Sequence, residues 1–250
     1  MAINWSNIDR RSTCGRVLRM PLRLLPHGKI MTIRRGPAAG LKWTVGSADH
    51  GCWLGTYELA KQRSLEQFVK RGMTIYDVGA QAGFYTLFFS CLVGSGGAVY
   101  SFEPCAYEAR NLLEHVRINH LQNVRVIQAA LWKTSGLSPL TIDQGQTQNK
   151  IPSGNGADSI LQVPTFALDE LKLPPPQLIK MDVEGAESAV LQGALRTLQE
   201  HRPIMFVALH DDEQRRACAE LLHRSNYTLY ALDGTRLSHH IELDEIYALP

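Results

Sequence analysis

The sequence predicts an α/β fold in which a mostly parallel sheet of seven strands carries helices on both faces. From about residue 72 onward, short apolar runs alternate with longer segments of helical periodicity, and this alternation is typical of parallel β-α-β units. The first unit also has a glycine-rich turn at 79–83 between its strand and its helix, which is where such sheets bind nucleotides. We therefore expect a Rossmann-like domain over 72–250 and an N-terminal extension over 1–71.

The N-terminal extension has three predicted parts. Nine Lys or Arg and a single acid, Asp9, occupy the first 42 residues. The clustered arginines among them alternate with apolar residues: Arg10, Arg11, Arg16, Arg19 and Arg23. Such a segment either contacts an anionic membrane surface weakly or forms a solvated arm or a packed helix. Strand candidates at 30–35 and 41–45 flank a Gly-Pro-Ala-Ala-Gly turn, which predicts a hairpin, and a helix is expected over about 56–71.

Strands and helices then follow in order along the predicted domain. We expect strands at 74–78, 98–102, 124–128, 177–182, 204–209, 227–231 and 245–249. Helices are expected at about 82–92, 105–119, 186–199 and 212–224. The third helix has an apolar stripe made of Val190, Leu191, Ala194, Leu195 and Leu198. The polar segment 143–159 is rich in Gly, Asn and Gln, and a loop of that length is either a substrate flap or disordered.

Composition limits the classes of function. The net charge is +2, and the basic residues gather near the N-terminus instead of lying among aromatic residues around the glycine turn, so nucleic acid is not expected as a partner. No signal peptide and no bilayer-spanning run is recognised. The five cysteines are scattered and lack a CxxC spacing, which favours reduced thiols in a cytoplasmic protein and argues against a structural zinc site.

The glycine turn predicts the type of cofactor. Its spacing is D-x-G-x-x-x-G, from Asp77 through Gly79 to Gly83. Gly79 permits a tight turn, and Gly83 removes a side chain that would keep a ligand off the backbone. The missing G-x-G-x-x-G pattern and an acid that would repel phosphate argue against a dinucleotide, and so against a dehydrogenase. Glu103 ends the next strand twenty residues after Gly83, where it can accept hydrogen bonds from both hydroxyls of a ribose. A ligand with a ribose, no phosphate and a positive end fits best, and S-adenosylmethionine has these properties.

A second group of polar residues follows the fourth and fifth strands. Asp182 and Glu184 come directly after the fourth strand, and ligands bind beyond the carboxyl ends of such strands. Glu187, in the first turn of the next helix, is most simply a partner of the helix dipole. Lys180 shares a strand face with Asp182 and can pair with an acid or position a substrate. His210 follows the fifth strand and can remove a hydroxyl proton near neutral pH.

These segments together resemble the FkbM-type methyltransferases, which depend on S-adenosylmethionine. The resemblance covers roughly 40–210. The similar segments are 53–58, 76–80, 83–86, 102–104, Asn119, 168–171, 179–187 and 191–194. The resemblance implies a class I methyltransferase fold and an acceptor hydroxyl on a sugar, glycan or secondary metabolite.

The resemblance also implies which residues form the site. Cofactor contacts would come from Asp77, Gly79, Ala80, Gln81, Gly83, Tyr85, Thr86, Glu103, Pro104 and Asp182. Asp77, Gly79 and Gly83 would line the methionine end, and Glu103 would hold the ribose. We expect the acceptor proton to be removed by Asp182, Glu184 or His210. No metal is predicted, because no recognisable ligand set accompanies Asp182 in the sequence.

Two departures from the family pattern affect this site. Position 81 is Gln where the family's turn usually has Asn, so the amide is kept with a different reach. Position 208 is Ala where an acid commonly precedes the histidine by two residues, and this removes one acid that could orient His210.

Two other functions are weighed against methylation of a hydroxyl. Nitrogen methyltransferases resemble one another in an Asn/Asp-Pro-Pro-aromatic turn after the fourth strand, whereas residues 182–185 read Asp-Val-Glu-Gly. The second alternative is a module that binds the cofactor without catalysis.

Overall fold

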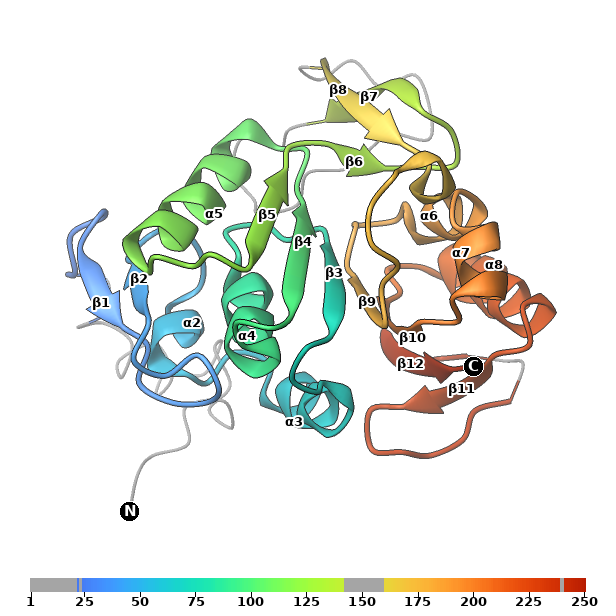
Figure 1. The fold of residues 1–250 in the computed structure, drawn as a ribbon, viewed down its shortest axis with the longest axis horizontal. Helices are drawn as coiled ribbons and strands as arrows, with labels where there is room; N and C mark the ends of the chain where they lie inside the picture. The colour runs from blue at the N-terminus through green and yellow to red at the C-terminus, as the bar shows by residue number, and fades with distance from the viewer. Residues whose placement is uncertain (1–21, 23, 142–159, 239–240) are drawn as a thin grey trace.

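The computed structural model describes residues 22, 24–141, 160–238 and 241–250, and a seven-stranded sheet forms its centre (Figure 1). In spatial order the strands are β11 (Thr228–Ala231), β12 (Glu245–Leu249), β10 (Ile204–Ala208), β9 (Leu178–Met181), β3 (Thr74–Val78), β4 (Ala98–Phe102) and β5 (Val124–Ile127). Among these seven strands, β12 alone runs in the direction opposite to the other six. The predicted mostly parallel α/β sheet is confirmed. Its chain order reverses between β3 and β9, which creates a crevice at their carboxyl ends.

Helices cover both faces of the sheet. The first group consists of α2 (His50–Leu54), α3 (Leu59–Phe68), α4 (Phe84–Val93) and α5 (Ala106–Ile118). The other group is α6 (Glu187–Gln192), α7 (Leu195–Glu200) and α8 (Asp212–Arg224). Because side chains alternate along a strand, Ile75 of β3 packs with Leu65 and Phe88 on the first face. Its neighbour Tyr76 belongs to the core that includes Leu191 and other residues of the second group.

Most predicted elements are present, and one predicted helix is interrupted. The region predicted as a helix over 56–71 contains α3, and α2 precedes it as an unpredicted short helix. Asp49 caps α2 by accepting a hydrogen bond from the Gly51 N–H, and Gly55 ends it in the left-handed region at φ 72°. The helix predicted over 186–199 is divided into α6 and α7 at Gly193, where a Cβ would lie 2.1 Å from the carbonyl oxygen of Trp132. The break takes Leu195 off the predicted stripe and leaves it 38% exposed.

A smaller sheet that the sequence analysis did not predict follows β5. It contains β6 (Ala130–Leu131), β8 (Ile160–Phe166) and β7 (Gly136–Thr141), in that order, and the 3-10 helix η2 (Leu168–Glu170) comes next. Pro139 and Pro164 lie inside β7 and β8, and proline within a strand removes a donor from the ladder. The two segments therefore did not read as strands. The predicted flap at 143–159 lies outside the described residues.

The predicted hairpin of the N-terminal extension is present but short. It consists of β1 (Ile30–Thr32) and β2 (Lys42–Thr44), with Met31 opposite Trp43. The five arginines of the predicted basic segment lie outside the described residues. Among the helices that are described, none has both the length and the apolar composition needed to cross a membrane.

The close contact at Gly193 gives a stability prediction. We expect Gly193→Ala to lower the free energy of unfolding by about 1–3 kcal/mol, because the added methyl group must displace the backbone at Trp132. Urea denaturation measures this change. The matched control is Gly96→Ala, where a Cβ would meet no atom within 4 Å and where we expect little loss. Equal stability of the two variants would contradict this account of the break between α6 and α7.

Candidate functional site

Two cavities meet at the carboxyl ends of β3 and β9. Gly79, Gln81 and Asp182 line both of them. The first cavity continues along Glu103, Pro104, Glu108, Leu131 and Leu140. The second cavity continues along Trp43, Tyr57, Ala80, Gly83, Tyr85 and Lys180. A ligand longer than either cavity can therefore cross the glycine turn and occupy both.

The glycines of the turn allow two close contacts. Gly79 has φ +74°, and a Cβ there would lie 1.8 Å from the carbonyl oxygen of Asp182, so this glycine brings the turn against the end of β9. Gly83 has φ +93°, and a Cβ there would lie 2.3 Å from Leu112 Cδ1. Gly83 lines the second cavity, and the space beside its Cα is filled by Leu112 of α5, a contact that the sequence did not predict.

Glu103 is the main acid of the first cavity. It is 5% exposed, and its two carboxylate oxygens accept hydrogen bonds of 2.8 Å from the backbone N–H groups of Gln81 and Cys105. Burial raises the pKa of Glu103 to about 7, against the lowering effect of these two hydrogen bonds. Each oxygen keeps a lone pair, so the carboxylate can still accept hydrogen bonds from two hydroxyls.

Glu108 is a second acid of this cavity that sequence reasoning missed. Its Oε2 is buried and has no hydrogen-bond partner among the described residues, and burial raises the pKa of Glu108 to about 6. Within the sequence it looks like an ordinary acid in the first turn of α5. Its only signal was its place five residues after Glu103, and the structure gives it an oxygen available to a ligand donor such as an amine.

Two predicted cofactor residues lie behind the cavities instead of lining them. Asp77 is fully buried, and its Oδ2 accepts a hydrogen bond of 2.7 Å from Thr86 Oγ1. Its Oδ1 lies 3.4 Å from Lys180 Nζ. Since Lys180 lines the second cavity, Asp77 and Thr86 hold a cavity-lining residue in place and contact a ligand only through it.

Residues of the N-terminal extension form one wall of the second cavity. The ammonium group of Lys61, which is 5% exposed, lies 2.8 Å from Glu58, 3.9 Å from Asp182 and in contact with Glu245. Tyr85 donates a hydrogen bond of 2.8 Å to Glu58. The sequence analysis did not predict this network, because a lysine in a predicted helix reads as a surface residue.

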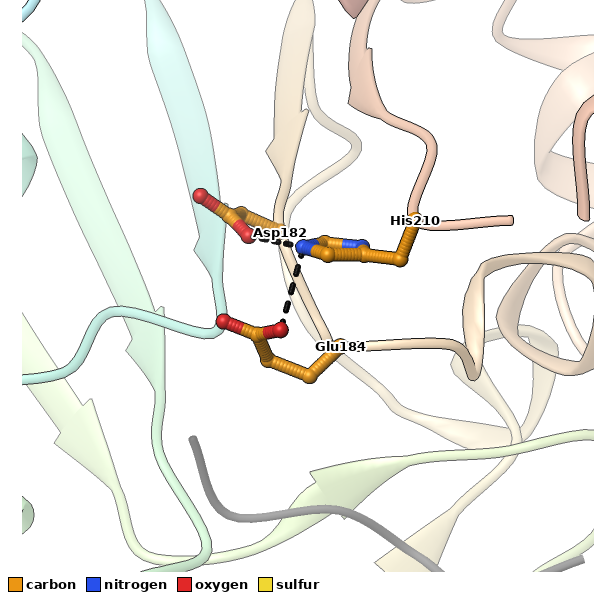
Figure 2. Close-up of side chains that lie close together, drawn as sticks. All are labelled: Asp182, Glu184 and His210. Atoms are coloured by element: carbon orange, nitrogen blue, oxygen red, sulfur yellow. Dashed lines mark ion pairs between the residues drawn. The ribbon is translucent and has the colours of Figure 1, made fainter. Parts of the chain in front are cut away.

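The three predicted base candidates lie together, and we call them the carboxylate–imidazole cluster: Asp182, Glu184 and His210. Figure 2 shows His210 pointing between the two carboxylates. Its Nε2 lies 3.4 Å from Asp182 Oδ1 and 3.2 Å from Glu184 Oε2. Asp182 and Glu184 come from the end of β9 and His210 from the end of β10, so adjacent parallel strands produce this convergence.

Glu187 contacts the ring nitrogen of His210 that faces away from Asp182 and Glu184. Its Oε1 lies 2.7 Å from His210 Nδ1 and also accepts a hydrogen bond from the Gly185 N–H. Glu187 therefore interacts with the start of α6, as predicted, and in addition fixes the orientation of the imidazole. The acid missing at Ala208 is not needed for this purpose. Glu245 lies opposite Ala208 on β12, and its carboxylate pairs with Lys61.

The surroundings shift the pKa values within the cluster. Burial lowers the pKa of His210, but the carboxylates of Glu187, Glu184 and Asp182 outweigh it and raise that pKa above its ordinary value. Burial acts to raise the pKa of Asp182, yet Lys180, Lys61 and His210 hold that pKa below its ordinary value. The cluster thus favours a positively charged imidazole beside the ionised carboxylate of Asp182.

The cluster also brings together possible metal ligands that the sequence did not reveal. No ligand set was recognised around Asp182, but the structure brings one oxygen from Asp182, one from Glu184 and a nitrogen of His210 within 4.8 Å of one another. Carboxylate oxygens and imidazole nitrogens are common metal ligands. These residues can hold a cation, whereas Glu103 and Glu108 are placed to bind an organic ligand in the first cavity.

Comparisons with known proteins agree on one kind of domain. A family model described as the methyltransferase FkbM domain matches residues 77–242. The chain is similar in structure to methyltransferase FkbM from Methylobacillus flagellatus KT, with a TM-score of 0.51 and 18% identity over 81% of this chain. It spans only 56% of that protein. It is also similar to a SAM-dependent O-methyltransferase from Thermotoga maritima, with a TM-score of 0.50 and 11% identity over 92% of this chain and 80% of that one.

A third solved structure has the same fold. Precorrin-6y C5,15-methyltransferase from Geobacter metallireducens GS-15 has a TM-score of 0.50 and 12% identity over 81% of this chain and 90% of that one. No curated protein matches the chain. At these identities, the structural similarities establish the class I methyltransferase fold, and the family match establishes the kind of domain.

The Lys61 network, which touches the second cavity through Tyr85, gives a stability prediction. We expect Lys61→Met to lower the free energy of unfolding by about 3–5 kcal/mol, because it leaves Glu58 and Glu245 without their buried cation. Denaturant unfolding followed by circular dichroism measures the change. Arg63→Met, which removes an exposed cation from the same helix, is the control and should change stability little. A similar small effect of both variants would show that the network does not support the fold.

Proposed function

Because the chain belongs to the FkbM methyltransferase family, we propose that it transfers a methyl group to a hydroxyl of a sugar, glycan or secondary metabolite. The methyl donor is S-adenosylmethionine. The observation that carries the hydroxyl assignment is the carboxylate–imidazole cluster, which lies beside the glycine turn and shares Asp182 with both cavities. An alcohol is a poor nucleophile until its proton is drawn off, so a hydroxyl acceptor needs such a group of bases.

The two cavities suit the two ends of the donor. The first cavity receives the adenosine, with the ribose hydroxyls on Glu103 and the adenine amine within the reach of Glu108 Oε2. The second cavity receives the methionine end, next to Gly79 and Lys180. The sulfonium then lies at the turn, where Asp182 borders both cavities. This placement is supported by the shape and the charges of the cavity walls.

The reaction is an in-line displacement. The acceptor oxygen forms a bond to the methyl carbon while the carbon–sulfur bond breaks, and that electron pair stays on sulfur to give S-adenosylhomocysteine. The hydroxyl proton leaves at the carboxylate–imidazole cluster. Alignment of oxygen, methyl and sulfur supplies much of the acceleration, and removal of the proton adds a typical factor of about 10²–10⁴.

A methyl-transfer assay tests the proposal. Purified protein is incubated with isotopically labelled S-adenosylmethionine and two panels of acceptors, one of hydroxylated sugars and metabolites and one of amines, and the products are identified by mass spectrometry. We expect a methyl ether from the first panel. Transfer to amines alone would instead identify a nitrogen methyltransferase. Tight binding of S-adenosylhomocysteine without turnover on either panel would favour a cofactor-binding module.

The partners and the cellular location of the protein are predicted from the sequence alone. We propose no nucleic-acid partner. A cytoplasmic location and a weak membrane contact through the basic N-terminal segment stay predictions, and fractionation of cells expressing the protein would test both.

The raised pKa of Glu103 predicts a pH dependence of donor binding. The ionised carboxylate is the better acceptor for ribose hydroxyls, and its pKa of about 7 in the unliganded protein means that protonation competes with binding below that pH. We expect the affinity for S-adenosylhomocysteine to be nearly complete at pH 8, about half of that at pH 7 and about tenfold lower at pH 6. Isothermal titration at several pH values measures it. Glu103→Gln should bind weakly at every pH; a variant with the pH profile of the wild type would contradict the ribose assignment.

The contact between Glu187 and His210 predicts a catalytic effect at a distance from the substrates. We expect Glu187→Gln to lower kcat by about 10–100-fold, because the imidazole loses the carboxylate that orients it. The affinity for S-adenosylhomocysteine should stay near that of the wild type, since Glu187 lines neither cavity. Steady-state kinetics and isothermal titration separate these two effects. Glu200→Gln, an exposed acid on α7, is the control, and a full kcat in Glu187→Gln would remove Glu187 from the mechanism.

A further inference from the structure

We propose that the carboxylate–imidazole cluster binds one divalent transition-metal cation, of the Mn²⁺ or Zn²⁺ kind, which in turn binds the acceptor hydroxyl. The inference rests on the proposed function for the role of the cation in the reaction. The binding site itself rests on the arrangement of Asp182, Glu184, His210 and Glu187 alone.

The donor atoms form one compact face. Nε2 of His210 is 3.4 Å from Asp182 Oδ1 and 3.2 Å from Glu184 Oε2, and the three donor atoms lie within 4.8 Å of one another. A cation with bonds of about 2.0–2.2 Å to carboxylate and imidazole can reach all three after small side-chain adjustments. Because these residues come from the ends of two adjacent strands (Figure 2), the rigid sheet holds the site.

A buried carboxylate outside the three ligands has the arrangement found behind metal-binding histidines. Such histidines almost always donate their second ring N–H to a carboxylate, a carbonyl or water, and this fixes the nitrogen that faces the metal. Glu187 is fully buried and lies 2.7 Å from His210 Nδ1, so Nε2 is the nitrogen presented to the cluster. The other oxygen of Glu187, Oε2, is buried and lacks a hydrogen-bond partner within the described part of the chain. Negative charge at this point is therefore incompletely compensated.

The balance of charge around the cluster also favours a cation. Three carboxylates, from Asp182, Glu184 and Glu187, surround one imidazole. Two ammonium groups act on Asp182, and both are shared with other carboxylates. Lys180 pairs with Asp77, and Lys61, 3.9 Å from Asp182, also pairs with Glu58 and Glu245. Even with His210 protonated, the four groups carry an excess of negative charge. Partly buried like charges raise the free energy unless a counter-charge joins them, and a divalent cation supplies it.

The three donor side chains are only partly buried, so the site has room for a further ligand. The side chains of Asp182, Glu184 and His210 are 17%, 12% and 23% exposed, and the first two also line the first cavity. Three protein ligands leave coordination positions for water or substrate, as catalytic metal sites do. The mixed nitrogen and oxygen donors favour Mn²⁺ or Zn²⁺ over Ca²⁺ or Mg²⁺, which bind through oxygen.

The cation would change how the hydroxyl loses its proton. A hydroxyl bound to a divalent cation is a stronger acid, so its proton passes to solvent water as the oxygen attacks the methyl carbon. The carbon–sulfur bond breaks as before, and its electron pair stays on sulfur. In this arrangement His210 serves as a ligand, and Glu187 is the positioning residue that holds it.

Direct binding of Mn²⁺ tests the inference without any acceptor. Protein freed of metal by a chelator and a desalting step is titrated with Mn²⁺, and unbound Mn²⁺ is measured by electron paramagnetic resonance. We expect one Mn²⁺ per chain in the wild type and at least a tenfold weaker affinity in Glu184→Gln and in His210→Asn. Glu213→Gln removes an exposed acid near His210 on α8 and should bind Mn²⁺ as the wild type does. Zn²⁺ added in competition should displace Mn²⁺ from the wild type.

Outcomes that overturn the inference differ from those that overturn the proposed function. Absence of Mn²⁺ binding by the wild type, or equal binding by all four proteins, would overturn the metal site. A thermal unfolding transition like that of the wild type, followed by circular dichroism, shows that Glu184→Gln and His210→Asn are folded, so their loss of Mn²⁺ would support the metal site. Methyl transfer to a hydroxyl at full rate in the presence of the chelator would overturn the role of the cation and leave the proposed function standing.

Discussion

The site depends on one close backbone contact. The turn after β3 approaches the end of β9 so closely that a Cβ on Gly79 would lie 1.8 Å from the carbonyl oxygen of Asp182. This contact places Asp182 at the junction of the two cavities. It also lets Lys180 reach across to the carbonyl oxygen of Gly79, at 3.2 Å. A bulkier residue at position 79 would push apart the two strand ends from which donor binding and the carboxylate–imidazole cluster are both built.

Around that contact, each buried charged side chain has hydrogen-bond or ion-pair partners. Asp77 has Lys180 and Thr86 beside it, and Glu103 has two backbone donors. Lys61 has three carboxylates near it. Removing one partner of a buried ion pair is costly, so these networks fix the geometry of the walls. The cluster at Asp182, Glu184 and His210 differs in its position, because two carboxylates converge on one imidazole at the edge of the first cavity. For this reason we propose it as the place where chemistry occurs.

The sequence predicted the parts of the structure that follow from local pattern. β3, β4, β12 and α8 lie where periodicity placed them, because their apolar spacing matches one strand face or one helix stripe. The break at Gly193 was not predictable, since it results from a contact with Trp132 that is distant in sequence. Lys61 and Glu108 were missed for a similar reason: a charged residue in an amphipathic helix reads as exposed. Only tertiary packing shows that Lys61 and the Oε2 atom of Glu108 are buried. The three base candidates were found because carboxyl ends of neighbouring parallel strands must share an edge, whereas the support of His210 by Glu187 depends on side-chain direction.

The contact of Lys61 with Glu245 joins α3, near the beginning of the described chain, to β12, at its end. The family model matches 77–242, so both members of this pair lie outside the matched segment. A shortened protein cut to that segment would lose both charges together, along with β12. Removal of only one flank would leave either Lys61 or Glu245 without its partner. A transfer of this domain into another protein must therefore include both the segment with α3 and the segment with β12.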